Sequence, residues 1–367
     1  MLACRGYKYR IYPAKAQVQK IESFLGASRF VYNHFLKLKQ DLYASFKKSM
    51  GQAEVMRLVT QLKAKHDFVW LAASDSMALQ ESIKDLFKAF DNFFSKRGKF
   101  PRFKRKHAAK QSYRTRNQKN CIRITGSYIT LPKLGKVKAR ISRIPSGRIL
   151  NATVTKSSSG KYFVSLCVEE EILFPVTDNR QIGIDVGLKD FASLSTGESI
   201  PREKFLSCYE KRLVKEQRRL SHKKKGSQNY QKQSIRLAKV HEKISNTRND
   251  FLHKQSSLLA RENQVVCAED LNIKGMLHNH HLAKAISDAS WSRFLTLLDY
   301  KLSARSGVLI KVPTFYPSSQ TCSCCGFQNP IVKDLSIRQW VCPQCSTHHN
   351  RDINAARNIL SKGLSMP

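Results

Sequence analysis

Residues 181–187 read Gln-Ile-Gly-Ile-Asp-Val-Gly, an apolar run that ends on the carboxylate of Asp185. A second run of the same type, Gln264-Val-Val-Cys-Ala268, leads directly into Glu269. Short continuous apolar runs of this kind are typical of strands buried on both faces. A third acid, Asp352, stands just before or within the first turn of an expected helix. The sequence therefore predicts a sheet that gathers three acids at one edge.

Three carboxylates gathered at a sheet edge need a counter-charge, because a buried charge without a partner is costly. Hard oxygen ligands select Mg²⁺ or Mn²⁺, and two such ions about 4 Å apart can activate a water and stabilise the leaving oxygen of a phosphodiester. Taken singly, Asp185 could cap a turn, Glu269 could be a surface acid and Asp352 could be a helix N-cap. Their combination in a chain with few acids favours a two-metal site.

The charge balance of the chain points to a polyanionic partner. The 367 residues include 65 Lys plus Arg against 27 Asp plus Glu, a net charge of +38, with 41% hydrophobic residues to form a core. Such a surplus repels itself unless a polyanion lies beside it, so nucleic acid is the expected partner and an anionic membrane the alternative. The first residues lack the apolar core of a signal peptide, and no 18-residue apolar run occurs. We therefore expect a soluble, intracellular protein.

Two segments carry much of this positive charge. Residues 96–119 contain eleven Lys or Arg and no acid, with Phe100, Phe103 and Tyr113 among them, and residues 211–248 contain thirteen Lys or Arg against two acids. A charge run is often only a solvated loop, but unrelieved positive charge with interleaved aromatics is typical of a surface that follows phosphates and stacks bases. The candidate nucleic-acid contacts are Arg97, Lys99, Arg102, Lys104, Arg105, Lys106, Arg218, Arg219, Lys223, Lys224 and Lys225.

Half of the ten cysteines lie together near the C-terminus. Cys322 and Cys325 form one C-x-x-C pair, Cys342 and Cys345 form another, and sixteen residues separate the pairs. This spacing is typical of a four-thiolate zinc site, which is closed and therefore structural. Buried free cysteines or a redox pair are the alternative. Cys324 could replace a neighbour, but it lacks the two-residue gap.

The remaining patterns divide the chain into several parts. Strand-like alternation over residues 7–12 and helical spacing over 15–96 precede short strand-like runs between 121 and 173, which predict a small β-barrel or sheet module. Residues 203–263 are helical in pattern, and the break at 223–227 predicts two antiparallel helices. The fold class expected is multidomain, with α+β and α/β parts.

Eight short sequence fragments, in their order along the chain, resemble the TnpB family. This family consists of transposon-encoded RNA-guided nucleases related to the type V CRISPR effectors. The resemblance covers nearly the whole chain. The fragments are residues 7–13 (YKYRIYP), 26–33 (GASRFVYN), 100–104 (FPRFK), 183–187 (GIDVG), 268–272 (AEDLN), 319–326 (SQTCSCCG), 340–345 (WVCPQC) and 351–356 (RDINAA).

The resemblance implies a RuvC nuclease of ribonuclease-H-like fold whose triad is Asp185, Glu269 and Asp352, holding two Mg²⁺ or Mn²⁺ ions, and one structural Zn²⁺ on a ribbon. The implied domains are a wedge β-barrel (1–14 and 97–180), a helical recognition domain (15–96), the RuvC domain (181–316 and 350–367) and the zinc ribbon (317–349).

The resemblance also implies the partners: a guide RNA from the transposon end and a double-stranded DNA target, cut on both strands beside a short adjacent motif. Gln80 falls where the family reads that motif. Many relatives have an acid at the position of Asn350, so a changed contact near Asp352 is implied there. The protein is expected to be a monomer or a dimer in the cytoplasm of a prokaryote, associated with the nucleoid.

Three other functions fit parts of the sequence. A guided DNA-binding repressor with weak or no cleavage would be expected to lack one of the acids, yet all three are present. A transposase or transposition accessory protein would need strand-joining chemistry; His278-Asn-His280 has the spacing of a metal-binding pair but no nearby Tyr, so we interpret it as a polar loop. A non-catalytic RNA-binding zinc-ribbon protein would not need acids at strand ends.

Overall fold

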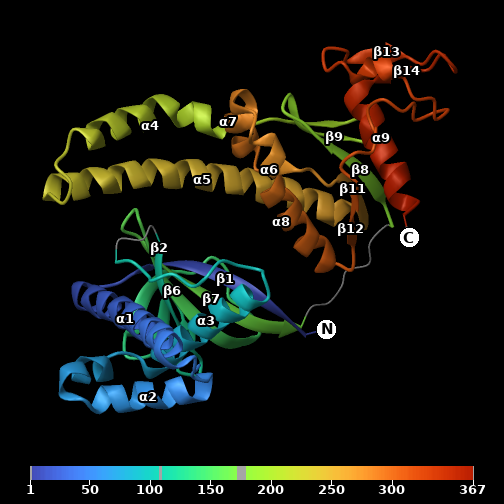
Figure 1. Ribbon diagram of the computed structural model, residues 1–367. Helices are drawn as coiled ribbons and strands as arrows, with labels where there is room; N and C mark the ends of the chain where they lie inside the picture. The colour runs from blue at the N-terminus through green and yellow to red at the C-terminus, as the bar shows by residue number, and fades with distance from the viewer. Residues whose placement is uncertain (1, 107–109, 172–178, 367) are drawn as a thin grey trace. The chain divides into compact units, whose positions relative to one another are not determined.

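The computed structural model describes residues 2–106, 110–171 and 179–366 (Figure 1). The chain divides into two compact units, Met1–Ile172 and Leu173–Pro367, and each has its own sheet and core. Parts of the expected wedge barrel, residues 107–109 and 172–178, lie outside the described residues. Within the described residues, no helix combines the length and apolar character that a membrane span needs.

The first unit is built on an antiparallel sheet in the order β2-β6-β7-β1-β5-β4-β3. Strand β1 pairs with both β5 and β7, and its alternation places Tyr7, Tyr9 and Ile11 in the core. The strands are β1 (Leu2–Tyr12), β2 (Lys110–Arg116), β3 (Arg123–Thr125), β4 (Tyr128–Leu131), β5 (Gly135–Arg140), β6 (Arg148–Ser157) and β7 (Tyr162–Glu171).

Helices account for the segment with helical spacing in the same unit. They are α1 (Lys15–Phe46), α2 (Gln52–Ala64), the 3₁₀-helix η1 (His66–Ala73) and α3 (Ser76–Phe94). The Asp75 side chain caps α3 by accepting a hydrogen bond from the Met77 backbone N–H. Phe35, Leu71, Leu79 and other apolar side chains of these helices form a second core, as the spacing predicted.

Strand β2 occupies a stretch whose charge pattern predicted a base-stacking surface. Tyr113 is only 4% exposed and meets Phe24 edge to face, so its ring belongs to the core and cannot stack on bases. Phe100 packs against Phe90 and Phe93. The alternation of inward and outward side chains along β2 is hard to recognise in the sequence, because basic residues occupy several of its positions.

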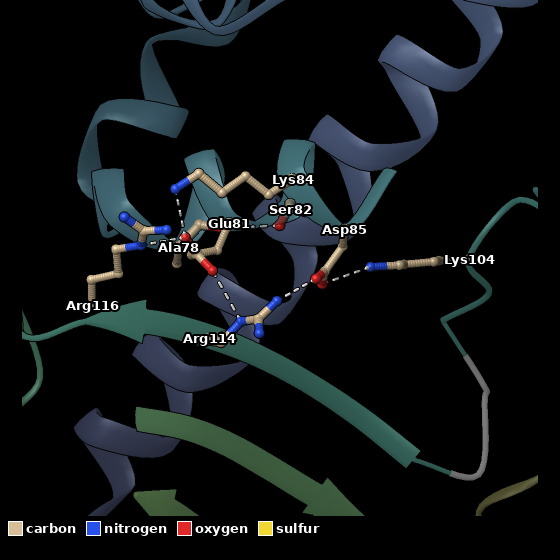
Figure 2. Close-up of polar contacts among 8 residues, drawn as sticks. All are labelled: Ala78, Glu81, Ser82, Lys84, Asp85, Lys104, Arg114 and Arg116. Atoms are coloured by element: carbon tan, nitrogen blue, oxygen red, sulfur yellow. Dashed lines mark hydrogen bonds and ion pairs between the residues drawn. The ribbon is translucent and has the colours of Figure 1, made fainter. Parts of the chain in front are cut away.

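Ion pairs with helix α3 explain how the arginines of β2 can lie on a partly buried strand. Figure 2 shows the carboxylate of Glu81, which is 5% exposed, between Lys84 and two arginines of β2. Arg114 Nε lies 3.0 Å and Arg116 Nε 2.7 Å from the Glu81 oxygens, and Arg114 also pairs with Asp85. These arginines therefore hold α3 on the sheet and are already engaged within the protein.

The second unit contains a five-stranded sheet in the order β10-β9-β8-β11-β12. Strand β11 pairs in parallel with both β8 and β12, whereas β9 pairs antiparallel with both β8 and β10. The strands are β8 (Gln181–Val186), β9 (Asp190–Leu194), β10 (Ser199–Pro201), β11 (Val265–Glu269) and β12 (Val308–Val312).

Helices cover both faces of this sheet. Cys267 faces Ile359 of α9, whereas its neighbours Val266 and Ala268 face the opposite core, to which α5 and α8 contribute. The elements are α4 (Phe205–Ser221), α5 (Gln228–Glu262), α6 (Ile273–Met276), α7 (His280–Ala289), α8 (Trp291–Ser303), η2 (Pro330–Lys333), β13 (Gln339–Val341), β14 (His348–Asn350) and α9 (Arg351–Leu364). Helices α4 and α5 lie side by side as a hairpin (Figure 1), as the break at 223–227 predicted.

Two glycines allow α9 to lie directly on the sheet. A Cβ at Gly183 would stand 2.0 Å from the Ala356 carbonyl oxygen, and a Cβ at Gly363 would stand 2.5 Å from Cys267 Sγ. Both distances are shorter than any real Cβ contact. The missing side chains therefore set the separation between β8, which carries Asp185, and α9, which carries Asp352.

We expect Gly183→Ala to displace α9 and to lower the free energy of unfolding by about 1–3 kcal/mol or more, because the obstructing atoms are backbone. Denaturant unfolding measures the loss. Gly6→Ala is the matched control, since Gly6 is also a strand glycine but a Cβ added to it would meet nothing within 4 Å. Equal stabilities of the two variants would contradict this account of the α9 contact.

Candidate functional site

The three predicted acids line one pocket of about 410 Å³ in the second unit. Register explains part of this: Ala268 pairs with Ile184, so Glu269 and Asp185 end neighbouring parallel strands at the same edge. Asp352 reaches the pocket from the first turn of α9. Residues 314–320, Leu335, Arg338 and Arg351 complete the lining, together with Val186, Gly187 and Ala355.

The electrostatics of the pocket are those of crowded carboxylates. Burial and the nearby charges of Asp352 and Glu269 raise the pKa of Asp185 to about 8, although Arg351 and Arg338 act in the opposite direction. Burial also raises the pKa of Glu269. The metal-free pocket therefore favours the protonated form of Asp185, and bound divalent cations would favour its charged form.

Asp352 is held by two neighbours. Asn350, and not Asp352, is the N-cap of α9: its side-chain oxygen accepts hydrogen bonds from the backbone N–H groups of Asp352 and Ile353. The Arg338 guanidinium lies 3.3 Å from an Asp352 oxygen. The Asn350 side chain thus fixes the start of the helix that carries the third acid.

The three carboxylates do not form a compact ligand group like that of the cysteines. Among the described residues, only the cysteine cluster brings three or more His, Cys, Asp or Glu ligand atoms within 4.8 Å of one another.

The cysteine cluster has the dimensions of a tetrahedral thiolate site. Cys322, Cys325, Cys342 and Cys345 place their sulfurs within 4.8 Å of one another, and the Cys322–Cys345 and Cys325–Cys342 sulfurs are 3.6 Å apart. Ligands at the Zn–S distance of about 2.3 Å give a tetrahedral edge of about 3.8 Å. Cys324 is exposed and lies outside this set.

His349 joins this cluster although its sequence surroundings did not single it out. The ring is buried against Trp340, and Nε2 lies 3.0 Å from the sulfur of Cys322. Burial lowers the pKa of His349. A neutral imidazole N–H can donate to a thiolate, and the position four residues after Cys345 was the available signal.

Asparagines of α9 tie the ribbon to the acid-bearing helix. Asn354 accepts a hydrogen bond from the Ser323 backbone N–H at 2.9 Å and donates to the Thr321 carbonyl at 2.7 Å. Asn358 donates to the carbonyls of Ser318 and Thr321. Both side chains are buried, so the first cysteine knuckle and Asp352 belong to one rigid assembly.

The predicted nucleic-acid contacts have different surroundings. Lys104 is engaged: its backbone bonds Asn33 in both directions, and its ammonium lies 4.1 Å from the centre of the Tyr32 ring and 4.0 Å from Asp85. Gln80 is half-buried on α3. Lys104 is nevertheless exposed, as are Arg97, Lys99, Arg102, Arg105 and Lys106, the other basic candidates of the first unit.

The other basic candidates lie where α4 ends and the α4–α5 hairpin turns. Arg218, Arg219, Lys223, Lys224 and Lys225 are all exposed, and Arg219 pairs with Glu216 at 3.4 Å. The predicted polar loop at His278 and His280 is only partly correct, because His280 begins α7. Both histidines are exposed and belong to no compact ligand group among the described residues.

Comparison with family models places known families along the chain. A model described as "Probable transposase" (OrfB_IS605) matches residues 165–280, and one described as "Cas12f1-like, TNB domain" matches residues 291–359. A third, "Helix-turn-helix domain", matches residues 1–48, where the structure has β1 followed by the 32-residue helix α1.

The fold is that of compact CRISPR effectors. The Cas12f1 chain of a Cas12f1–sgRNA–target DNA complex matches with a TM-score of 0.54 at 12% identity, over 98% of each chain.

A protein of Streptomyces pristinaespiralis named "Putative RNA-guided DNA endonuclease" is 35% identical over 98% of this chain and 90% of its own length. InsQ of Escherichia coli K12, with the same description, is 32% identical over 99% and 93%. The chain belongs to the TnpB family.

The raised pKa of Asp185 predicts how the metal-free protein depends on pH. An Asp with a folded-state pKa of about 8 and an ordinary value of about 3.9 contributes stability at low pH that is lost as the pH rises toward 8. Asp185→Asn carries no charge, so its melting temperature in EDTA is expected to rise relative to wild type between about pH 5 and pH 8.

Asp250→Asn is the control for this experiment, because Asp250 is 64% exposed and pairs with Lys254 on the surface of α5. It should track the wild type. Mg²⁺ is expected to stabilise the wild type at pH 8 and to have much less effect on Asp185→Asn. A pH-independent difference between Asp185→Asn and wild type would show that Asp185 titrates normally.

For the cysteine cluster, we expect Cys342→Ser to lower zinc content from about one ion per chain and to lower the melting temperature with it. Cys324→Ser is the control, because Cys324 is an exposed cysteine of the first knuckle that lies outside the ligand set, and it should keep both values. Elemental analysis and thermal unfolding measure them. A full zinc complement in Cys342→Ser, or its loss in Cys324→Ser, would contradict the assignment of ligands.

Proposed function

We propose that the protein is an RNA-guided DNA endonuclease of a transposon that cuts double-stranded DNA by metal-dependent phosphodiester hydrolysis. The observation that carries the proposal is the pocket shared by Asp185, Glu269 and Asp352, in a chain that belongs to the TnpB family. The names of the relatives and the fold shared with a Cas12f1 chain support guide RNA and target DNA as the partners.

The three carboxylates are the proposed catalytic residues. The chemistry of the donor set fits two Mg²⁺ or Mn²⁺ ions, which when bound would activate a water and stabilise the leaving 3′-oxygen. Asp185 gives up the proton that it holds in the free pocket, Asn350 fixes the first turn of α9, and Arg338 supplies a positive charge beside Asp352. The four thiols fit one structural Zn²⁺ that shapes the ribbon without taking part in chemistry.

The proposed domains follow from the family. Residues 1–14 and 97–180 form the wedge β-barrel, 15–96 the helical recognition domain, 181–316 and 350–367 the RuvC domain, and 317–349 the zinc ribbon. Gln80 is proposed to lie near the target-adjacent motif. Base pairing with the guide reads the sequence, so the protein needs mainly charge that follows backbones. The exposed basic residues of 97–106 and of the α4–α5 hairpin supply such charge.

The test begins with the RNA that co-purifies with the protein, which is sequenced and used to design a matching DNA target. Wild-type protein is expected to cut this target in Mg²⁺, and Asp185→Ala to bind RNA and DNA normally while its cleavage rate falls by several orders of magnitude. Asp250→Ala, an exposed acid of the same unit, is the control. Retained cleavage in Asp185→Ala would overturn the assignment, and binding without cleavage by wild type would favour the guided repressor.

A further inference from the structure

An exposed aromatic ring stands in the carboxylate pocket. Phe315 is 94% exposed, which is the largest exposure of any described apolar side chain of its size, and it lines the same pocket as the three acids. It belongs to none of the described ring pairs. Exposing a whole Phe side chain forgoes about 1.5–3 kcal/mol of burial, so a fully solvated ring beside a charged pocket needs an explanation.

The segment that carries Phe315 is held firmly. Its neighbour Tyr316 packs on the core formed by Cys267, Val312 and Ile359, and the Tyr316 backbone N–H donates to the Pro313 carbonyl at 3.1 Å. Thr314 donates to the Asp270 carbonyl. With Tyr316 anchored inward, Phe315 is directed outward by the fold. Its exposure is therefore a built feature of the loop after β12.

The other lining residues indicate what the ring meets. Leu335, 70% exposed, adds a second apolar side chain from the ribbon, and Arg338 adds a cation beside Asp352. A ligand that presents an aromatic face and a phosphate together fits this combination. A base within a duplex has its faces covered by its neighbours, so the matching ligand is an unpaired nucleotide of a single strand.

We propose that Phe315 is a positioning residue that stacks on an unpaired base of the strand being cut and so holds the adjacent phosphate at the carboxylates. This inference rests on the proposed nuclease function. Stacking on a phenyl ring tolerates every base, which suits an enzyme whose sequence preference comes from its guide. Leu335 covers the same nucleotide from the ribbon.

The test uses the full-length protein with its co-purified RNA and a target DNA in which single nucleotides around the cut are replaced by abasic sites. At one position the abasic site is expected to slow single-turnover cleavage by wild type about 5- to 150-fold, the range for one lost base–aromatic stack. Phe315→Ala should be slowed by the same factor on intact DNA and be insensitive to the abasic site. Phe315→Tyr should restore both the rate and the sensitivity.

Ile331→Ala is the control for loss of an exposed apolar side chain. Ile331 lies on the ribbon and is 70% exposed, as Leu335 is, but it does not line the pocket. It should behave as wild type. If the effects of Phe315→Ala and of every abasic site on the cleavage rate were additive, Phe315 would have only a structural role and the stacking proposal would be overturned. Cleavage by the wild type would still support the nuclease function in that case.

A binding measurement keeps the two proposals separate. Single-stranded DNA containing 2-aminopurine is added in Ca²⁺ to the Asp185→Asn protein, with Phe315 or with Phe315→Ala. Quenching of the fluorescent base that depends on Phe315 supports stacking even if the wild type proves unable to cut. Equal quenching in both proteins would overturn the stacking proposal whatever the cleavage result.

Discussion

The gathering of three carboxylates in one partly buried pocket is the constraint on which the second unit depends. Strands β8 and β11 bring Asp185 and Glu269 to one sheet edge, and α9 adds Asp352. Burial first, and then the charges of Asp352 and Glu269, raise the pKa of Asp185 to about 8. The fold accepts this cost without relieving it: Arg338 and Arg351 lie nearby, yet the net effect still disfavours the charged form. Sites that are destabilising until a ligand binds are typical of function and not of packing.

The remainder of the unit keeps this arrangement in place. Gly183 and Gly363 let α9 lie against the sheet, Asn350 fixes where the helix begins, and Asn354 and Asn358 tie it to the first cysteine knuckle. A metal bound by the four thiols would therefore stabilise the same assembly that presents Asp352, which explains how a ribbon without chemistry of its own can matter to the pocket. In the first unit, side-chain contacts likewise hold a helix on a sheet: Glu81 and Asp85 of α3 form ion pairs with the arginines of β2.

The sequence predicted those features that follow from short patterns. Asp185 and Glu269 stand at the ends of apolar strand-like runs, so their meeting in one pocket could be predicted. The two C-x-x-C pairs have the spacing typical of a four-thiolate site, so the sulfur cluster could be predicted as well. The misassigned features depend on partners distant in the chain. Tyr113 and the arginines of β2 look like a nucleic-acid surface until α1 supplies the ring of Phe24 and α3 supplies two acids. The only sequence signal for His349 was its position four residues after Cys345, and no local pattern encodes the exposure of Phe315.

The central claim, that the three acids hold a pair of divalent ions, is tested most directly by electron paramagnetic resonance of the metal-free protein titrated with Mn²⁺. Two ions about 4 Å apart are exchange-coupled. The account predicts binding of two Mn²⁺ per chain with a coupled spectrum, which Glu269→Gln converts to that of an isolated ion or abolishes. A single uncoupled Mn²⁺ in the wild type, or a coupled spectrum unchanged in Glu269→Gln, would contradict it.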